Sequence, residues 1–235
     1  MTFHKTIQQA LQKTLSLLLP NHCLLCDDPC SDALCEQCQR DLPTLVLSCE
    51  ICSVPLTATG ICGECQQHKP SYDASVIPFL YAGHLPTLIN QFKHRGQRRV
   101  GTLLTSMLEN SLAKTSDKPD LLVPVPLHWR HLALRGFNQS EIIAQQLSKQ
   151  TAIPLAHPLK KRRATRHQQQ LTRKQRLANN RHAFYLKQAC SVRHVGLVDD
   201  VVTTGATAEI LAQMLKRNGV DKITVCALAR TPKQQ

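Results

Sequence analysis

Aromatic side chains are scarce in this sequence of 235 residues, which has one Trp, three Tyr and five Phe, together 4% of the chain. Long hydrophobic runs are missing too, since no apolar run approaches the roughly 20 residues that a membrane-spanning helix needs. The first residues are interrupted by polar side chains such as Lys5, Gln8 and Gln9, so they lack the apolar region of a signal peptide. We therefore expect no membrane span and a cytoplasmic location.

Acidic residues are the second shortage. Sixteen Asp and Glu stand against 29 Lys and Arg, which gives a formal net charge of +13. No acidic residue lies between Glu141 and Asp199, and this interval holds the basic residues Lys149, Lys160, Lys161, Arg162, Arg163, Arg166, Arg173, Lys174, Arg176, Arg181, Lys187 and Arg193. Such a field favours anionic partners. Because few aromatic residues lie near it, we expect any contact with DNA to be electrostatic and salt-sensitive, with little base stacking.

Cysteine, in contrast, is abundant. Eight of the 11 cysteines form four C-x-x-C pairs, which are Cys23 with Cys26, Cys35 with Cys38, Cys49 with Cys52, and Cys62 with Cys65. This is metal-ligand spacing, and two such pairs complete a tetrahedral site of four cysteine sulfurs. We predict two structural Zn²⁺ ions, with consecutive pairs sharing one metal. Iron–sulfur clusters and an interleaved pairing are the alternatives.

Composition divides the chain into three parts. Residues 1–20 have the pattern of an amphipathic helix, residues 21–70 hold the cysteine pairs as two zinc ribbons, and residues 71–235 alternate short apolar runs with amphipathic stretches. That alternation is typical of βα units around a parallel sheet. We predict strands at residues 75–81, 121–125, 194–198 and 222–229, and helices at residues 87–93, 100–114, 139–151 and 207–218.

Residues 195–207 carry the strongest functional pattern. An apolar strand leads into Asp199 and Asp200, and a small, hydroxyl-rich loop then opens a helix. Backbone N–H groups at a helix N-terminus make an anion site, and adjacent carboxylates accept hydrogen bonds from a vicinal diol or help to hold hydrated Mg²⁺. The alternative is a turn whose threonines only cap the helix. Two adjacent carboxylates repel, however, and need a cation or hydroxyl partner.

This segment resembles the loop of type I phosphoribosyltransferases that binds 5-phosphoribosyl-1-pyrophosphate (PRPP) with Mg²⁺. The resemblance implies that Asp199 and Asp200 hold the ribose hydroxyls, and that the 5-phosphate is bound by Thr203, Thr204, Gly205, Ala206 and Thr207. Purine-salvage members often carry a carboxylate where this chain has Thr203. That departure argues against hypoxanthine or guanine chemistry.

Further blocks resemble the ComF/GntX family, which is named for competence and DNA utilisation, over essentially the whole chain. They are residues 81–83 with 92–96, residues 124–127 with 135–139, and a run that contains Thr165, Gln168, Leu171, Arg176, Asn179, Ala183 and Phe184. The resemblance implies an α/β domain of the type I phosphoribosyltransferase kind, a parallel sheet flanked by helices, preceded by a double zinc ribbon. It also implies a role in the uptake or utilisation of DNA.

Three basic side chains near these blocks are candidates for contact with the pyrophosphate. Arg130 and Arg135 suit bidentate contacts with oxyanions, and Lys93 offers a point charge. A second interpretation makes Arg135 and Gly136 a helix entry and Asn138 the cap of the next helix.

The acid-free strip at residues 159–181 has three interpretations, which are a loop that closes over PRPP, a surface that follows a nucleic-acid backbone, and a solvated loop. We predict a protein that binds PRPP or a related ribose phosphate and contacts DNA, especially single-stranded DNA, or a DNA-uptake or DNA-processing partner. An active phosphoribosyltransferase and a PRPP-sensing regulator remain alternatives, because the sequence locates no pocket for a nucleophile.

Overall fold

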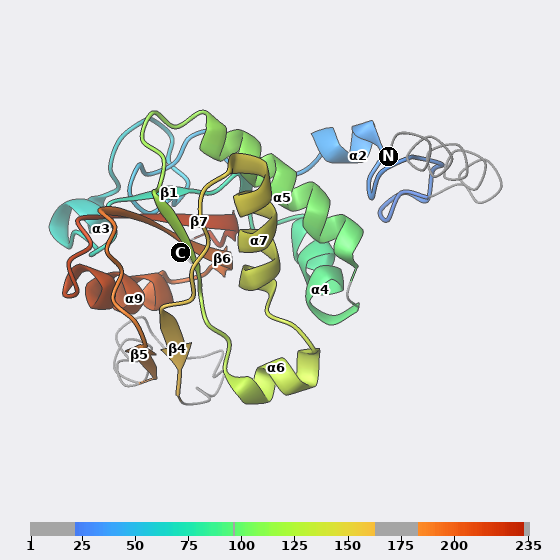
Figure 1. Cartoon of the computed structure of the whole chain (residues 1–235). Helices are drawn as coiled ribbons and strands as arrows, with labels where there is room; N and C mark the ends of the chain where they lie inside the picture. Colours follow the sequence, from blue (N-terminus) through green and yellow to red (C-terminus); the bar gives the residue numbers. More distant parts are fainter. Residues whose placement is uncertain (1–21, 96, 163–182, 233–235) are drawn as a thin grey trace.

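The computed structural model describes residues 22–95, 97–162 and 183–232 (Figure 1). The predicted helix at residues 1–20 lies outside these residues, and so does most of the basic strip at residues 159–181. None of the helices in the described ranges has the length and apolar character needed to cross a membrane.

A five-stranded parallel sheet forms the centre of the molecule. Its strands are β1 (Ala74–Val76), β2 (Phe79–Leu80), β3 (Leu121–Pro124), β6 (His194–Val202) and β7 (Lys222–Arg230). β1 and β2 pair one after the other with the same edge of β7, and the order continues through β6 to β3. The single strand predicted at residues 75–81 is wrong in this respect, because Pro78 offers no N–H to the ladder and divides it.

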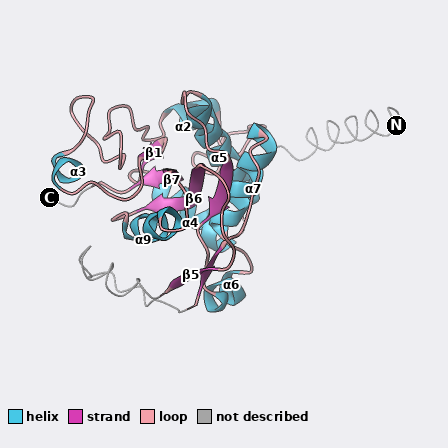
Figure 2. Ribbon diagram, turned by 60° about the vertical axis from the view of Figure 1, so that its left-hand side comes forward, coloured by secondary structure: helices cyan, strands magenta, loops and turns pink. Residues whose placement is uncertain are grey.

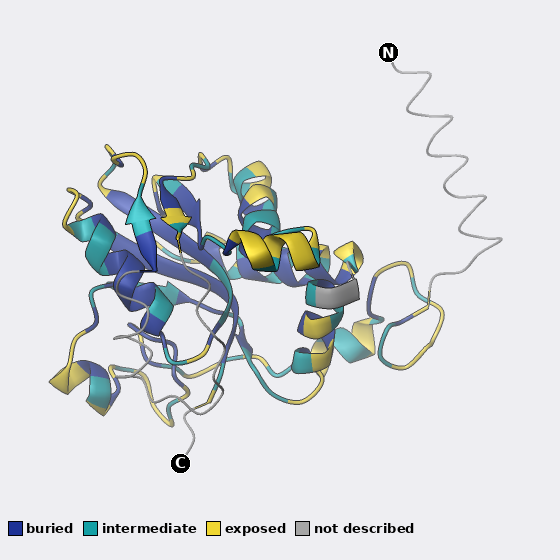
Figure 3. Ribbon diagram, turned by 90° about the horizontal axis from the view of Figure 1, so that it is seen from below, coloured by how far each residue is buried: buried dark blue, intermediate teal, exposed yellow. Residues whose placement is uncertain are grey.

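Helices cover both faces of the sheet (Figures 1 and 2). They are α4 (Leu85–Arg95), α5 (Arg98–Ala113), α7 (Gln139–Thr151) and α9 (Ala206–Lys216). Apolar side chains of α4, α5 and α7 share one buried cluster with the sheet, and those of α9 share another. Figure 3 shows the result, buried strands inside and helices with one exposed side. All four helices were predicted, with bounds that differ by a few residues at most.

Two short elements were not predicted. α6 (Trp129–Arg135) follows β3, and an antiparallel hairpin joins β4 (Leu159–Lys161) to β5 (Phe184–Leu186). Gly136 ends α6 with a φ of 77°, a left-handed conformation that suits glycine. The interpretation of Arg135 and Gly136 as a helix entry is therefore wrong, because they form a helix exit.

The cysteine-rich segment packs against the sheet. It includes α2 (Glu36–Arg40) and α3 (Gly63–Gln67), each of which begins directly after a cysteine. Between them, the N–H of Leu45 donates to the carbonyl of Pro78, and the N–H of Leu80 donates to that of Pro43, both at 2.8 Å. This linker therefore covers the edge of β2 that would otherwise be open to strand pairing.

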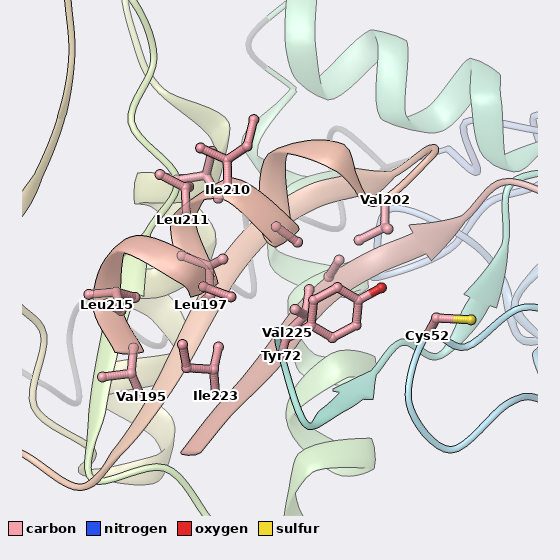
Figure 4. Close-up of a cluster of buried hydrophobic side chains, with 14 of the residues drawn as sticks. Cys52, Tyr72, Val195, Leu197, Val202, Ile210, Leu211, Leu215, Ile223 and Val225 are labelled. Carbon is pink, nitrogen blue, oxygen red and sulfur yellow. The ribbon is translucent and has the colours of Figure 1, made fainter. Parts of the chain in front are cut away.

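Each half of the cysteine-rich segment joins a different face of the sheet. Cys23, Leu34 and Leu42 belong to the buried cluster of α4, α5 and α7. Cys52 and Tyr72 belong to the buried cluster of α9, and Figure 4 shows them with side chains of β6, β7 and α9. The two halves are thus extensions of two separate hydrophobic cores.

Candidate functional site

The eight cysteine sulfurs of the C-x-x-C pairs gather in two groups. The first cysteine cluster is Cys23, Cys26, Cys35 and Cys38, and the second cysteine cluster is Cys49, Cys52, Cys62 and Cys65. Within each, the ligand atoms all lie within 4.8 Å of one another. The structure thus shows the consecutive pairing and not the interleaved one.

The sulfur spacing fits zinc. The Sγ atoms of Cys26 and Cys35 are 3.6 Å apart, and those of Cys52 and Cys62 are 3.7 Å apart. A tetrahedron with Zn–S bonds of about 2.3 Å has S···S edges of about 3.8 Å. Burial raises the pKa of the Cys49 thiol, but backbone hydrogen bonds, led by the one from the N–H of Cys62, outweigh it and lower this pKa to about 7. The sulfur spacing of both clusters therefore fits structural Zn²⁺.

The paired carboxylates lie near the carboxyl end of β6. The predicted strand ended at Val198, but β6 continues because Val201 and Val202 still pair with β7. One carboxylate oxygen of Asp199 accepts hydrogen bonds from the Ser140 hydroxyl and from the N–H of Asp200, both at 2.9 Å. Burial and the charge of Asp200 raise the pKa of Asp199 to about 7. The site thus holds a carboxylate that accepts or loses a proton near neutral pH.

One lysine contacts this acid pair, and a second one responds to its charge. The Lys93 ammonium, on α4, lies 2.8 Å from a carboxylate oxygen of Asp200, and both side chains are largely buried. Burial lowers the pKa of Lys161, on β4, while the charge of Asp199 opposes that shift. The structure therefore brings Lys93 to the acid pair, and it adds Lys161, which the sequence had not singled out for this site.

Tyr72 and Arg230 support the threonine-rich loop from the inner side. Gly205 is the N-cap of α9 with a φ of 76°, and a Cβ there would lie 3.2 Å from the Tyr72 hydroxyl. The Arg230 guanidinium donates hydrogen bonds to the carbonyls of Val202 and Thr203. With these carbonyls engaged on the inner side, the backbone turns so that the first N–H groups of α9 form the kind of site that binds an anion.

The assignment of Arg130 and Arg135 to the pyrophosphate stays a prediction. Arg130 and Arg135 are on α6, and in the part of the chain that the structure describes no hydrogen bond or ion pair joins them to the acid pair or to the threonine loop. The Arg130 guanidinium instead lies 5.3 Å from the centre of the Trp129 ring. Asn138 is the N-cap residue of α7, but its side chain donates to the carbonyl of Val125 at 3.0 Å and not to the helix.

Three residues that hold the site were missed by sequence reasoning. Ser140 lies one residue beyond a family block, where its position in the first turn of α7 was a usable signal. Tyr72 and Arg230 carried no such signal, because they reach the loop from segments distant in the sequence. Local patterns predicted the acid pair and the threonine loop, but not the residues that hold them in place.

A pocket of about 590 Å³ lies between α6, the start of α7 and the β4–β5 hairpin. Lys161, whose pKa responds to the charge of Asp199, is one of the residues that line it. Trp129 and Tyr185 line it as well. The expectation that the basic region has few aromatic partners overlooked Trp129, which is distant in the sequence from β5.

Comparison with known families and proteins places these features in context. The model of the "Double zinc ribbon domain" matches residues 14–66. The "DNA utilization protein YhgH" of Escherichia coli (strain K12) is 34% identical over 229 residues, which covers 92% of this chain and 99% of the relative. "Competence protein F" of Haemophilus influenzae is 34% identical over 209 residues, or 85% of this chain and 91% of the relative. "Competence protein ComFC" of Bacillus subtilis (strain 168) is 25% identical over 219 residues, 84% and 89% of the two chains.

The solved structures to which part of this chain is similar include phosphoribosyltransferases. The purine phosphoribosyltransferase of Pyrococcus horikoshii has a TM-score of 0.35 at 21% identity, over 55% of this chain and 73% of that one. The adenine phosphoribosyltransferase of Leishmania tarentolae has a TM-score of 0.33 at 13% identity, over 55% and 56%. These likenesses are distant.

Proposed function

Because the chain belongs to the ComF/GntX family, we propose that it binds PRPP or a related ribose phosphate with Mg²⁺ and serves the uptake or utilisation of DNA. The family relationship is shown by relatives named for competence and DNA utilisation that are 34% identical over most of the chain. The two halves of the proposal, ribose-phosphate binding and DNA contact, depend on different residues.

The observation that supports ribose-phosphate binding is the meeting of an acid pair and a helix N-terminus at one edge of the sheet. Asp199 and Asp200 offer acceptors for the ribose hydroxyls. The loop Thr203, Thr204, Gly205, Ala206 and Thr207 offers hydroxyl and N–H donors to the 5-phosphate. Ligands of open parallel sheets bind at this carboxyl edge.

Mg²⁺ suits the same place, because carboxylate and pyrophosphate oxygens are the hard ligands it prefers. Asp199 and Asp200 would hold the metal, and the metal would neutralise charge on the pyrophosphate. Lys93 already lies against Asp200. We propose that it moves from this carboxylate to the pyrophosphate when the ribose hydroxyls take its place.

DNA contact is supported by charge. The described part of the acid-free strip, residues 159–162, carries Lys160, Lys161 and Arg162 on and next to β4. Cations of this kind bind phosphates with little sequence preference and strong salt dependence. The proposed partner is DNA, especially single-stranded DNA, or a DNA-processing protein, and the proposed location is the cytoplasm.

Calorimetric titration of PRPP with Mg²⁺ tests the ribose-phosphate site. The wild type should bind, and Asp199→Asn with Asp200→Asn should weaken binding at least about 100-fold, because each carboxylate makes charge-assisted hydrogen bonds of about 1.5–3 kcal/mol. The control is Asp221→Asn, which removes one negative charge, half of that removed by the double variant, from an exposed carboxylate paired with Arg193 at the opposite end of the sheet.

Two results would contradict this half of the proposal. One is the absence of any heat of binding for the wild type, and the other is an equal affinity of the double variant and the control for PRPP. Pyrophosphate release in the presence of bases and amines would show transfer in addition to binding. DNA contact is tested separately, by the anisotropy of a labelled oligonucleotide over a salt series, where affinity should fall steeply as salt rises.

A further inference from the structure

The exposed tryptophan of α6 is the starting point. Trp129 has 63% of its surface exposed, and the next turn of α6 exposes Leu132 and Leu134 as well. None of the α6 residues is buried. Large aromatic side chains on a surface are typical of binding sites, because their exposure to water is unfavourable without a partner. α6 lies beside the β4–β5 hairpin in both views of Figures 1 and 2, and its outer side is open.

The pocket between these elements has the size of a small-molecule site. Its volume of about 590 Å³ lies within the range of roughly 300–1,000 Å³ that is usual for ligand pockets. Trp129 lines it from α6, Tyr185 from β5, and Phe137 from the segment before α7. Three aromatic residues from three segments therefore line one pocket, in a chain that has nine Phe, Trp and Tyr residues (five, one and three).

Positive charge surrounds the same rings. Arg98, Lys160 and Lys161 line the pocket. The Arg130 guanidinium lies 5.3 Å from the Trp129 ring centre, and the Arg162 guanidinium lies 4.6 Å from that of Tyr185. Such pairs hold cations next to aromatic faces. The ligand that fits therefore combines a flat ring with negative charge.

One carboxylate lies among these groups. Glu141 is the acid among the described residues that line the pocket, and it accepts hydrogen bonds from His157 at 2.8 Å and from Gln145 at 2.9 Å. Its oxygens are hydrogen-bonded to these two side chains, so the net charge that lines the pocket is positive. A ligand without negative charge would leave these cations unpaired.

Single-stranded nucleic acid matches both properties. Its bases have free π faces, and its backbone carries one negative charge per nucleotide. A duplex has its bases stacked inside and offers only phosphates to the same cations. An aromatic platform next to a basic groove is how proteins bind single strands without sequence preference.

We propose that the pocket between α6, α7 and the β4–β5 hairpin receives a base of single-stranded DNA, stacked on Trp129, while Lys160 and Arg130 bind the flanking phosphates. This inference rests on the proposed contact with DNA and locates it at a site separate from the ribose-phosphate loop. It also differs from the purely electrostatic contact that the sequence suggested, since the base itself contributes to binding.

Fluorescence gives a direct test, because Trp129 is the single tryptophan of the chain. Three DNAs of about 16 nucleotides, within the site sizes of single-strand binders, are titrated into the full chain. They are labelled oligo(dT), an abasic strand of the same length, and a duplex. Anisotropy reports total binding, and the emission of Trp129 reports stacking. We expect oligo(dT) to quench the emission of Trp129. The abasic strand and the duplex should leave this emission nearly unchanged.

Variants complete the test. Trp129→Ala should weaken oligo(dT) binding by about 5- to 100-fold, which corresponds to the loss of one base–aromatic stack, and Trp129→Phe should retain more of the affinity. Leu134→Ala is the matched control on α6, because Leu134 is 83% exposed and does not line the pocket. All three substitutions are at exposed positions, so the fold should be kept, and circular dichroism checks this.

The outcomes separate this proposal from the proposed function. Oligo(dT) binding that leaves Trp129 emission unchanged, or that is equally strong in Trp129→Ala, would overturn the pocket and keep the DNA contact; the pocket would then suit a protein side chain. Absence of any binding at low salt would overturn both. PRPP binding by Trp129→Ala should equal that of the wild type, and a loss there would also contradict a separate site.

Discussion

Asp199 is held in a setting that disfavours its charge. Burial and the neighbouring charge of Asp200 raise its pKa from 3.8 to about 7 in the folded protein. The folded state therefore binds a proton that the unfolded chain releases above about pH 4. The stabilisation from this proton is fully present below the unfolded pKa, and it is lost as the pH rises through about 7. The acid pair therefore makes the unliganded protein less stable in its ionised form.

This gives a prediction with a defined sign. Asp199→Asn places a neutral side chain where the wild type has a titrating one, so the stability of this variant relative to the wild type should increase with pH. Over a range of about 1.5 pH units on either side of the raised pKa, the free energy of unfolding of the wild type should fall by about 2 kcal/mol relative to the variant. Urea unfolding at several pH values with zinc present measures the difference.

Zinc loss at low pH affects both proteins equally and cancels in that comparison. A difference in stability that does not change with pH would show that Asp199 keeps an ordinary pKa. The same result would also argue against a destabilising effect of the ionised acid pair on the unliganded protein.

At the scale of elements, α4 and α5 approach each other closely at one glycine. A Cβ on Gly101 would lie 2.5 Å from the ring of Phe92, which is fully buried. In a helix interior, alanine is normally more stable than glycine by about 1 kcal/mol. Here the ring has no solvent to move into, so we expect Gly101→Ala to destabilise the protein by about 1–3 kcal/mol through overpacking.

The control for this prediction is Gly63→Ala in α3. A Cβ there would meet nothing within 4 Å, so the change should be neutral or slightly stabilising. Thermal unfolding of both variants with zinc bound compares them. Equal effects of the two substitutions would show that α4 and α5 are less closely packed than described.

The same scale shows how far the sequence predicts the fold. The helices and long strands follow from apolar periodicity and were predicted, and β6 and β7 gain a few residues because each pairs with the other to its end. α6 was missed because it buries no face and so has no amphipathic pattern. The close contact of Gly101 with Phe92 has no local pattern, since it depends on two helices meeting.

The site divides in a similar way. Asp199 and the threonine loop are adjacent in sequence, so a local motif was enough to propose them. The Ser140 hydroxyl and the Arg230 guanidinium reach them from other elements, and only the assembled sheet shows this. Trp129 gave no sign of a pocket because Tyr185, which lines the same pocket, lies on β5, far along the chain.

At the scale of the whole molecule, the two cysteine clusters have different connections to the candidate site. The Arg230 guanidinium donates to the carbonyl of Cys52 at 2.9 Å and to that of Thr203, so it joins the second cysteine cluster to the threonine loop. The first cysteine cluster instead meets the start of α5, where Arg99 donates to the carbonyl of Asp32 at 2.6 Å. Loss of the metal from the second cysteine cluster should therefore affect ligand binding, whereas loss of the metal from the first should not.

We expect Cys62→Ser to remove one zinc and to weaken PRPP binding about 10-fold or more, within the usual range of coupling between sites. Cys38→Ser, its matched control, should also remove one zinc but leave the affinity within about threefold. Metal analysis and calorimetry measure the two effects. Because coupling is reciprocal, PRPP should also slow the release of zinc from the second cysteine cluster to a chelator. Equal losses of affinity in the two variants would contradict the link through Arg230.

The position of β7 in the chain has a consequence for how the protein is made. β7 pairs with β1, β2 and β6, yet it follows all of them, and the contact of Arg230 with Cys52 spans 178 residues. At about 5–20 residues per second, a ribosome needs roughly 9–36 s to synthesise that interval. During this time the thiols of the nascent second cluster have no sheet to pack against. Zinc captured early is then what holds this segment together, so the supply of zinc during translation should limit the yield of folded protein.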